Sequence, residues 1–117
     1  MVLQELAKRI GARVITLGKP NTVEIDQVYC SDKISELLNN TSDTMLLVTR
    51  LANAAVMRVA ELMDAPGICL VEGVDPKPEV MHAAIEHGTL LIVSPVGMPE
   101  TCRRVRECLE DENEGGS

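Results

Sequence analysis

The side chains best suited to binding a ligand follow the apolar segments of the chain, at the point where each segment ends. The stretch LLVTRLAN (46–53) runs from apolar residues into Thr49, Arg50 and Asn53. A guanidinium beside hydroxyl and amide groups is suited to a carboxylate or a phosphate. Three other segments, VYCSD, LVEG and VSPVG, end in the same way and add Ser31, Asp32, Glu72, Gly73 and Ser94. We therefore expect a site for a small anionic ligand among these residues.

The same residue types also have purely structural roles. Ser31 and Ser94 are suited to cap helices, and Asp32 is suited to a first helical turn, where its charge complements the helix dipole. The alternative to an anion contact for Arg50 is a salt bridge with Glu72 or Asp32, of which we favour Glu72. Capping and pairing are therefore open readings beside ligand binding.

Catalytic and metal-binding motifs are absent from the sequence. It contains no G-x-G-x-x-G, no G-x-x-x-x-G-K-[ST] and no G-x-S-x-G. His82 and His87 are five residues apart, which puts them on different faces of a helix. No C-x-x-C pair occurs, and we expect reduced thiols at Cys30, Cys69, Cys102 and Cys108. We expect no metal and no cofactor, and a phosphotransferase or acyltransferase is the weaker alternative to a non-enzymatic protein.

The composition predicts one acidic domain. The chain has 117 residues, of which 45% are hydrophobic, and a net charge of -7. Such a charge disfavours nucleic acid and anionic membranes as partners. No apolar run approaches membrane-spanning length and the N-terminal region carries charges, so we expect a cytoplasmic protein. We expect a domain over residues 1–109 and an acidic disordered tail over 110–117.

The positions of the apolar residues predict an α/β fold. TMLLV, GICLV and TLLIV are continuous apolar runs, which are typical of strands covered on both faces in a parallel sheet. We predict a three-layer sandwich of helices around a mainly parallel sheet of about four to five strands. Helical patterns cover residues 3–10, 31–38, 51–63, 75–88 and 98–111, and two further strands are expected at 12–17 and 23–29. The first of these strands has no assigned place, because its link to the second is too short for a helical crossover. Ligands bind at the carboxyl ends of such parallel strands.

The stretch from Val28 to Val93 resembles a DRTGG domain. These small α/β modules occur alone, beside CBS domains, or in phosphotransacetylase-type and HPr-kinase-related proteins. VYCSDKISELL is similar to the family's opening segment, and the strands and helices that follow match its order. The matching positions are Tyr29, Asp32, Ser35, Asn53, Gly73, Pro78, Glu79, Gly88 and Ser94. The motif that names the family is degenerate, because Gln27 and Val28 stand where its two glycines would be.

The resemblance implies a regulatory or ligand-sensing module that often self-associates. We accordingly expect a non-enzymatic homodimer that binds a small anionic or nucleotide-like ligand at the strand ends. The alternative is a dimerising interaction module for a partner enzyme, with no small-molecule ligand. Its candidate surface is the helix over residues 51–63, which is apolar almost all round.

Overall fold

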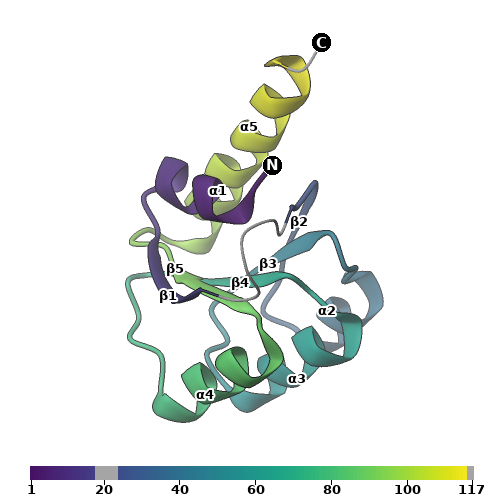
Figure 1. Cartoon of the computed structure of the whole chain (residues 1–117), viewed down its shortest axis with the longest axis vertical. Coiled ribbons are helices and arrows are strands. Elements are labelled where there is room, and N and C mark those ends of the chain that lie inside the picture. Colours follow the sequence, from purple (N-terminus) through teal and green to yellow (C-terminus); the bar gives the residue numbers. More distant parts are fainter. Residues whose placement is uncertain (18–23, 116–117) are drawn as a thin grey trace.

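A five-stranded sheet forms the middle layer of the protein (Figure 1). The computed structural model describes residues 1–17 and 24–115, with side chains up to residue 112 at the C-terminal end. In their order across the sheet, the strands are β1 (Arg13–Leu17), β5 (Leu90–Val93), β4 (Gly67–Leu70), β3 (Met45–Thr49) and β2 (Gln27–Cys30). The pairs β2–β3, β3–β4 and β4–β5 are parallel. The predicted α/β fold with a mainly parallel sheet is confirmed.

Helices cover both faces of this sheet (Figure 1). One face carries α1 (Leu3–Ile10) and α5 (Met98–Gly115), and the other carries α2 (Ile34–Asn40), α3 (Ala54–Met63) and α4 (Pro78–His87). Side chains alternate along a strand, so Leu46 and Val48 join the core under α1 and α5, and Leu47 joins the core under α2, α3 and α4. The two buried faces explain why these strands read as continuous apolar runs.

The first strand, β1, is antiparallel to its neighbour β5. β1 pairs antiparallel with β5, from Arg13 opposite Val93 to Leu17 opposite Leu90, and the register shifts between Val14 and Thr16. The Thr16 hydroxyl donates a hydrogen bond to the Thr89 carbonyl (2.9 Å) and accepts one from the Leu91 amide (3.0 Å). This side chain therefore supplies hydrogen bonds at a point where the backbone ladder is irregular.

Several helix boundaries differ from the predicted ones. Asn53 caps α3, which begins at Ala54, three residues later than predicted. The residues that precede α2 and α4 are Lys33 and Lys77, and neither caps its helix with its side chain. Helix α5 runs to Gly115, through much of the acidic stretch that we expected to be a disordered tail. Residues 18–23, in the short link between the first two strands, lie outside the described residues. Within the described part of the chain, none of the helices combines the length and apolar character needed to cross a membrane.

At Gly67 the packing of α1 on the sheet leaves no room for a side chain. A Cβ atom there would collide with the Leu3 side chain and lie 3.2 Å from the Leu90 carbonyl oxygen. We expect Gly67→Ala to lower the free energy of unfolding by about 1–3 kcal/mol, because overpacking outweighs the entropic gain of alanine. Urea denaturation followed by circular dichroism measures this loss.

The matched control is Gly97→Ala, just before α5. A Cβ atom at Gly97 would meet its nearest neighbour, Pro99 Cδ, at 3.9 Å, which is an ordinary contact. We expect this variant to lower the free energy of unfolding by less than about 1 kcal/mol, because the only cost is that alanine is less favourable than glycine before a helix. Equal losses at the two glycines would show that crowding against Leu3 does not limit Gly67.

Candidate functional site

The ends of the four parallel strands lie along one edge of the sheet. Cys30 is opposite Val48, Thr49 is opposite Leu70, and Leu70 is opposite Val93. The loops that leave these ends carry the residues that we predicted as ligand contacts. We call these residues the strand-end rim: Ser31, Asp32, Thr49, Arg50, Asn53, Glu72, Gly73 and Ser94.

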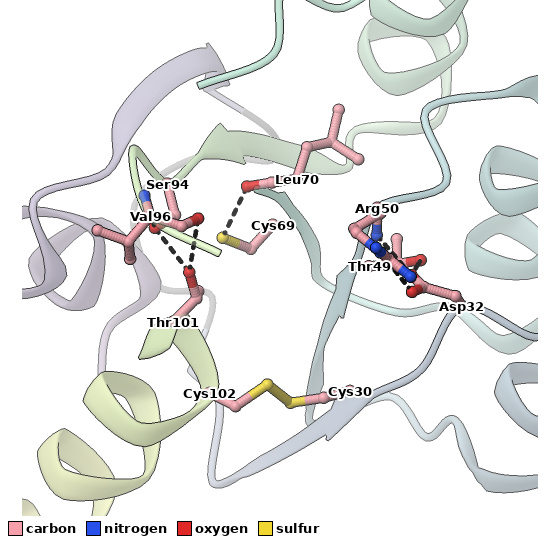
Figure 2. Close-up of a disulfide and its surroundings, with 10 residues drawn as sticks. All are labelled: Cys30, Asp32, Thr49, Arg50, Cys69, Leu70, Ser94, Val96, Thr101 and Cys102. Carbon is pink, nitrogen blue, oxygen red and sulfur yellow. Dashed lines mark hydrogen bonds and ion pairs between the residues drawn. A yellow bond between two sulfur atoms is a disulfide. The ribbon is translucent and has the colours of Figure 1, made fainter. Parts of the chain in front are cut away.

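Asp32 and Arg50 form an ion pair within this rim (Figure 2). Arg50 donates two hydrogen bonds to the carboxylate, one from its backbone amide to Oδ1 (2.8 Å) and one from Nε to Oδ2 (2.7 Å). The Thr49 hydroxyl donates to Oδ1 (3.3 Å) and accepts from the Leu51 amide (3.1 Å). The favoured pairing of Arg50 with Glu72 is therefore wrong, because the ion pair is made with Asp32.

These contacts shift the pKa of both Asp32 and Arg50. Burial alone would raise the pKa of Asp32, but the hydrogen bonds from Arg50 and Thr49 outweigh it, and the pKa lies below its ordinary value. The Arg50 pKa is raised by its hydrogen bond to Asp32, by the charge of Asp32 and, more weakly, by the charge of Glu72. Both members of the pair are therefore ionised at neutral pH.

Asp32 holds the guanidinium of Arg50 in place but leaves its terminal nitrogens accessible. Its side chain is 61% exposed, whereas that of Asp32 is 22% exposed. Of the three guanidinium nitrogens, only Nε bonds to the Asp32 carboxylate. Neither terminal nitrogen donates a hydrogen bond to another residue within 1–17 and 24–112. Arg50 thus presents two oriented donors to solvent at the end of a buried strand.

Ser31 and Asn53 both make structural hydrogen bonds, but only Asn53 caps a helix, so the suggested capping role of Ser31 is wrong. The Ser31 hydroxyl accepts from the Lys33 amide (3.0 Å) and donates to Glu36 (3.2 Å), so it shapes the entry to α2 without capping it. Tyr29 also donates to Glu36 (3.2 Å). The Asn53 side chain accepts from the Val56 amide (3.1 Å) at the start of α3.

Glu72 and Gly73 form a strained turn after β4. Both have left-handed backbone angles, with φ of 61° and 63°, and this conformation is costly for a residue with a side chain. The Glu72 amide donates to the Val96 carbonyl (2.8 Å) and the Gly73 amide to that of Ser94 (2.9 Å), which holds the turn against the loop after β5. The Glu72 side chain is exposed and makes no hydrogen bond within the described residues. It is thus a carboxylate held at the rim without a partner.

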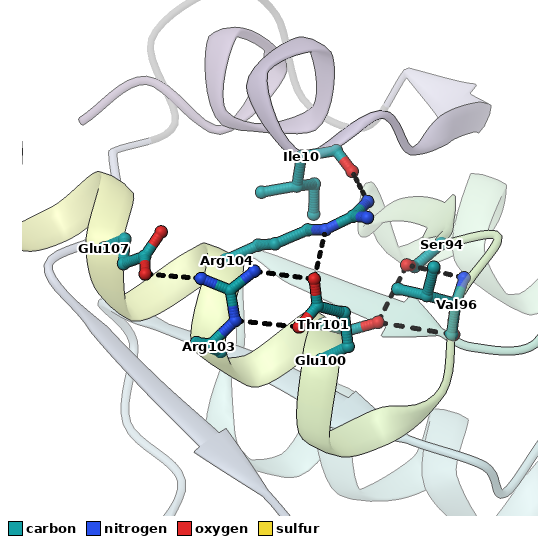
Figure 3. Close-up of polar contacts among 8 residues, drawn as sticks. All are labelled: Ile10, Ser94, Val96, Glu100, Thr101, Arg103, Arg104 and Glu107. Carbon is teal, nitrogen blue, oxygen red and sulfur yellow. Dashed lines mark hydrogen bonds and ion pairs between the residues drawn. The ribbon is translucent and has the colours of Figure 1, made fainter.

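Ser94 is turned into the protein and anchors α5 (Figure 3). It is fully buried, and its hydroxyl accepts hydrogen bonds from Thr101 (2.7 Å) and from the Val96 amide (3.4 Å). Farther along α5, Arg104 donates to the Ile10 carbonyl (3.0 Å) and to Glu100 (3.2 Å), which ties α5 to α1. Ser94 therefore links the loop after β5 to the first turn of α5 instead of facing solvent.

A disulfide joins Cys30 to Cys102, so the expectation of four reduced thiols is wrong (Figure 2). The bond connects the end of β2 to the first turns of α5, at a Cα–Cα distance of 6.6 Å. Cys69 and Cys108 are free and buried, and burial raises the pKa of Cys69 to about 12 and also raises that of Cys108. One end of the bridge adjoins the rim, since Cys30 precedes Ser31, and the other end follows Thr101, which donates a hydrogen bond to Ser94.

His87 lies at the end of α4 that is farther from the rim, and His82 lies near the middle of that helix. His87 Nε2 is 3.4 Å from Asp64 Oδ1, and both residues line a cavity of about 300 Å³ with Glu24, Asp43 and Gly88. No group of three or more histidine, cysteine or acidic side chains in the described part of the chain is arranged to hold a metal ion.

The fold is similar to that of a known regulatory region. A solved structure of the CBS and DRTGG domains of the regulatory region of Clostridium perfringens pyrophosphatase, complexed with the activator diadenosine tetraphosphate, aligns with a TM-score of 0.68 at 12% sequence identity. The alignment covers 89% of this chain and 45% of that one, so this chain spans less than half of that structure. This likeness concerns the fold and does not establish membership of the DRTGG family. No protein-family model and no curated protein sequence matches the chain.

The Asp32 contacts predict a pH dependence of stability. The folded-state pKa of Asp32 lies below the unfolded value of about 3.9, so its contribution is complete above that value and is lost as pH falls through the folded pKa. We expect Asp32→Asn to lower the free energy of unfolding by about 1–2 kcal/mol at pH 7. The difference from wild type should shrink as the pH falls below about 4 in urea denaturation.

The control for this variant is Asp111→Asn. Asp111 pairs with Arg9 at the surface, where the two side chains are 63% and 40% exposed. Exposed pairs of this kind contribute little, so the stability of this variant should stay close to that of wild type both at pH 7 and below about pH 4. A difference between wild type and Asp32→Asn that stays constant with pH would argue against the ionised Asp32 as its source.

The disulfide predicts a response to reductant. We expect reduction by a dithiol to lower the free energy of unfolding by about 2–4 kcal/mol, because the bond links residues 72 apart and restricts the unfolded chain. The double variant Cys30→Ser/Cys102→Ser should lose a similar amount and then be insensitive to reductant. If the double variant responds to reductant as the wild type does, the stabilising bond lies elsewhere.

Proposed function

We propose that this protein is a non-enzymatic, ligand-sensing regulatory module that binds a nucleotide-like anion at the strand-end rim. The observation that carries the proposal is the geometry of Arg50. Asp32 holds its Nε at 2.7 Å, while its terminal nitrogens have no partner in the described structure. A guanidinium oriented in this way binds a phosphate through two parallel hydrogen bonds.

The Glu72 carboxylate, which has no partner among the described residues, indicates which class of anion fits the rim. The three charged groups of the rim, Asp32, Arg50 and Glu72, carry a net negative charge, which opposes a bare multivalent anion. A nucleotide suits them better, because its phosphate binds Arg50 while a ribose hydroxyl or a base amino group donates to Glu72. The strained backbone at Glu72 supports this role, since such strain is concentrated at functional sites.

The remaining polar groups of the rim support binding without chemistry. The Ser94 hydroxyl is fully buried and bonded to Thr101, and that of Ser31 is bonded to Glu36. His87 lies at the end of α4 that is farther from the rim, and His82 lies near the middle of that helix. We therefore propose no reaction at this edge, and a sensing role that acts on a partner enzyme or a further domain. The similarity in fold to a regulatory region solved with a nucleotide activator supports the same role.

Thermal unfolding with a ligand panel tests this proposal. The panel holds inorganic phosphate, an acyl phosphate, AMP, ATP and diadenosine tetraphosphate. We expect at least one nucleotide to raise the melting temperature of wild type more than phosphate does. Arg50→Ala should raise the Kd of that nucleotide by at least about tenfold, through loss of a charge-assisted hydrogen-bond pair. Glu72→Gln should weaken the binding of that nucleotide but not the binding of inorganic phosphate.

Arg103→Ala is the matched control for Arg50→Ala. Arg103 is also half-exposed, with 55% of its side chain accessible, and it pairs with Glu100 and Glu107 on α5 (Figure 3). Its removal changes the net charge equally and should leave ligand binding unchanged. The proposal fails if no compound stabilises the protein, or if the two arginine variants bind equally.

A further inference from the structure

The Cys30–Cys102 disulfide lies close in the chain to the residue that orients the Arg50 guanidinium (Figure 2). Asp32 comes two residues after Cys30, on the loop that leaves β2. Its carboxylate accepts hydrogen bonds from the Arg50 backbone amide (2.8 Å) and from Arg50 Nε (2.7 Å). The orientation of the guanidinium therefore depends on where the end of β2 holds Asp32.

The other end of the bridge is firmly anchored. Cys102 is buried on α5, and the residue before it, Thr101, donates a hydrogen bond to the buried Ser94 hydroxyl (2.7 Å). Farther along the helix, Arg104 donates to the Ile10 carbonyl of α1 (3.0 Å). These contacts fix the start of α5 to the loop after β5 and to α1, and they do not involve β2.

Packing restrains β2 less than the other parallel strands. It lies at an edge of the sheet and pairs with β3 alone among the described strands. None of its residues is buried, whereas every residue of β3, β4 and β5 is. The covalent bond to α5 is therefore a main restraint on the strand end that positions Asp32.

The properties of the four cysteines confine redox chemistry to this bridge. Cys30 is partly exposed on the edge strand, so a small dithiol has access to the bond from that side. Cys69 and Cys108 are buried, and burial raises the pKa of Cys69 to about 12 and also raises that of Cys108. The thiolate is the form that attacks a disulfide, so neither of these residues exchanges with the bridge at neutral pH.

We propose that the Cys30–Cys102 disulfide is a redox switch for ligand binding at the rim, which acts by holding Asp32 against Arg50. A dithiol supplies the two electrons and two protons. Its thiolate attacks one sulfur of the bridge, the S–S bond breaks, and its second thiol closes the reagent into a disulfide, which leaves Cys30 and Cys102 as thiols. The end of β2 is then free to move relative to α5, and Asp32 no longer fixes the guanidinium. The switch rests on the proposed function, because it acts on the same site.

Titration calorimetry in the two redox states tests the switch. The probe is the tightest binder among AMP, ATP and diadenosine tetraphosphate. We expect dithiothreitol to raise its Kd for wild type by at least about fivefold, because an unoriented guanidinium must be ordered on binding. Cys30→Ser/Cys102→Ser should bind as reduced wild type does, whatever the reductant. Equal Kd values in the two states of wild type would overturn the switch alone, whereas an oxidised wild type that binds no nucleotide would overturn the proposed function as well.

Asp32→Asn shows whether the bridge acts through Asp32. This variant lacks the carboxylate that orients Arg50, so its Kd should be raised already in the oxidised protein. Reduction should then change the Kd by less than about twofold, because both changes remove the same interaction. If Asp32→Asn loses as much affinity on reduction as wild type does, the bridge acts through another residue and the proposal is wrong.

Two further variants separate the switch from a general loss of stability. Gly67→Ala destabilises the fold with the bridge intact, so its Kd in the oxidised state should match that of wild type. Cys108→Ala removes a thiol from α5 but keeps the bridge, so it should respond to dithiothreitol as wild type does. Binding by Gly67→Ala that is as weak as in the reduced protein, or a Cys108→Ala variant that no longer responds, would contradict the switch.

Hydrogen exchange tests the mechanical link without a ligand. The Arg50 amide donates to Asp32, and the Leu91 amide donates to Thr16 near the opposite edge of the sheet. Reduction should accelerate exchange at Arg50 more than at Leu91, because the loosening is local to the end of β2. An acceleration at Leu91 that equals or exceeds that at Arg50 would indicate a global loss of stability and overturn the proposal.

Discussion

The burial of β3, β4 and β5 on both faces is the constraint from which the rest of the structure follows. Every residue of these strands is buried, so neither face can carry an unpaired polar side chain. Thr49 closes β3 with its hydroxyl bonded to Asp32 and to the Leu51 amide, and Ser94 follows β5 with its hydroxyl bonded to Thr101. Polar chemistry is therefore confined to the strand ends, which the parallel order brings to one edge.

This constraint also explains why so much of the fold could be predicted from the sequence. A strand covered on both faces must be apolar throughout, and that pattern is visible at residues 45–49, 67–70 and 90–93. The glycines at 11 and 88 follow helices and adopt the left-handed angles that end them. The residues of the candidate site could be named for the same reason, because strand ends mark the edge of the sheet. Their role in binding stays a prediction.

The remaining features depend on distances that the sequence does not carry. Asp32 and Glu72 follow the two strands that flank β3, so both were available to Arg50. The left-handed turn at Glu72 is bound to the loop after β5, whereas the loop after β2 brings Asp32 to the Arg50 amide. The antiparallel pairing of β1 with β5 contains a register shift at which the Thr16 hydroxyl makes two hydrogen bonds, and nothing near Thr16 in the sequence indicates it. The cysteines of the disulfide are paired only because α5 packs over β2.

The disulfide makes the middle of the chain a covalent ring. Residues 30–102 form this ring, which contains β3, β4, β5, α2, α3 and α4, while α1, β1 and most of α5 extend from it. A single peptide-bond cleavage in a loop of the ring opens it without separating the pieces, so all the parallel strand ends stay on one connected molecule. A cleavage before Cys30 separates α1 and β1 from the ring and leaves only non-covalent contacts to hold them. The chain therefore tolerates a nick very differently on the two sides of that residue.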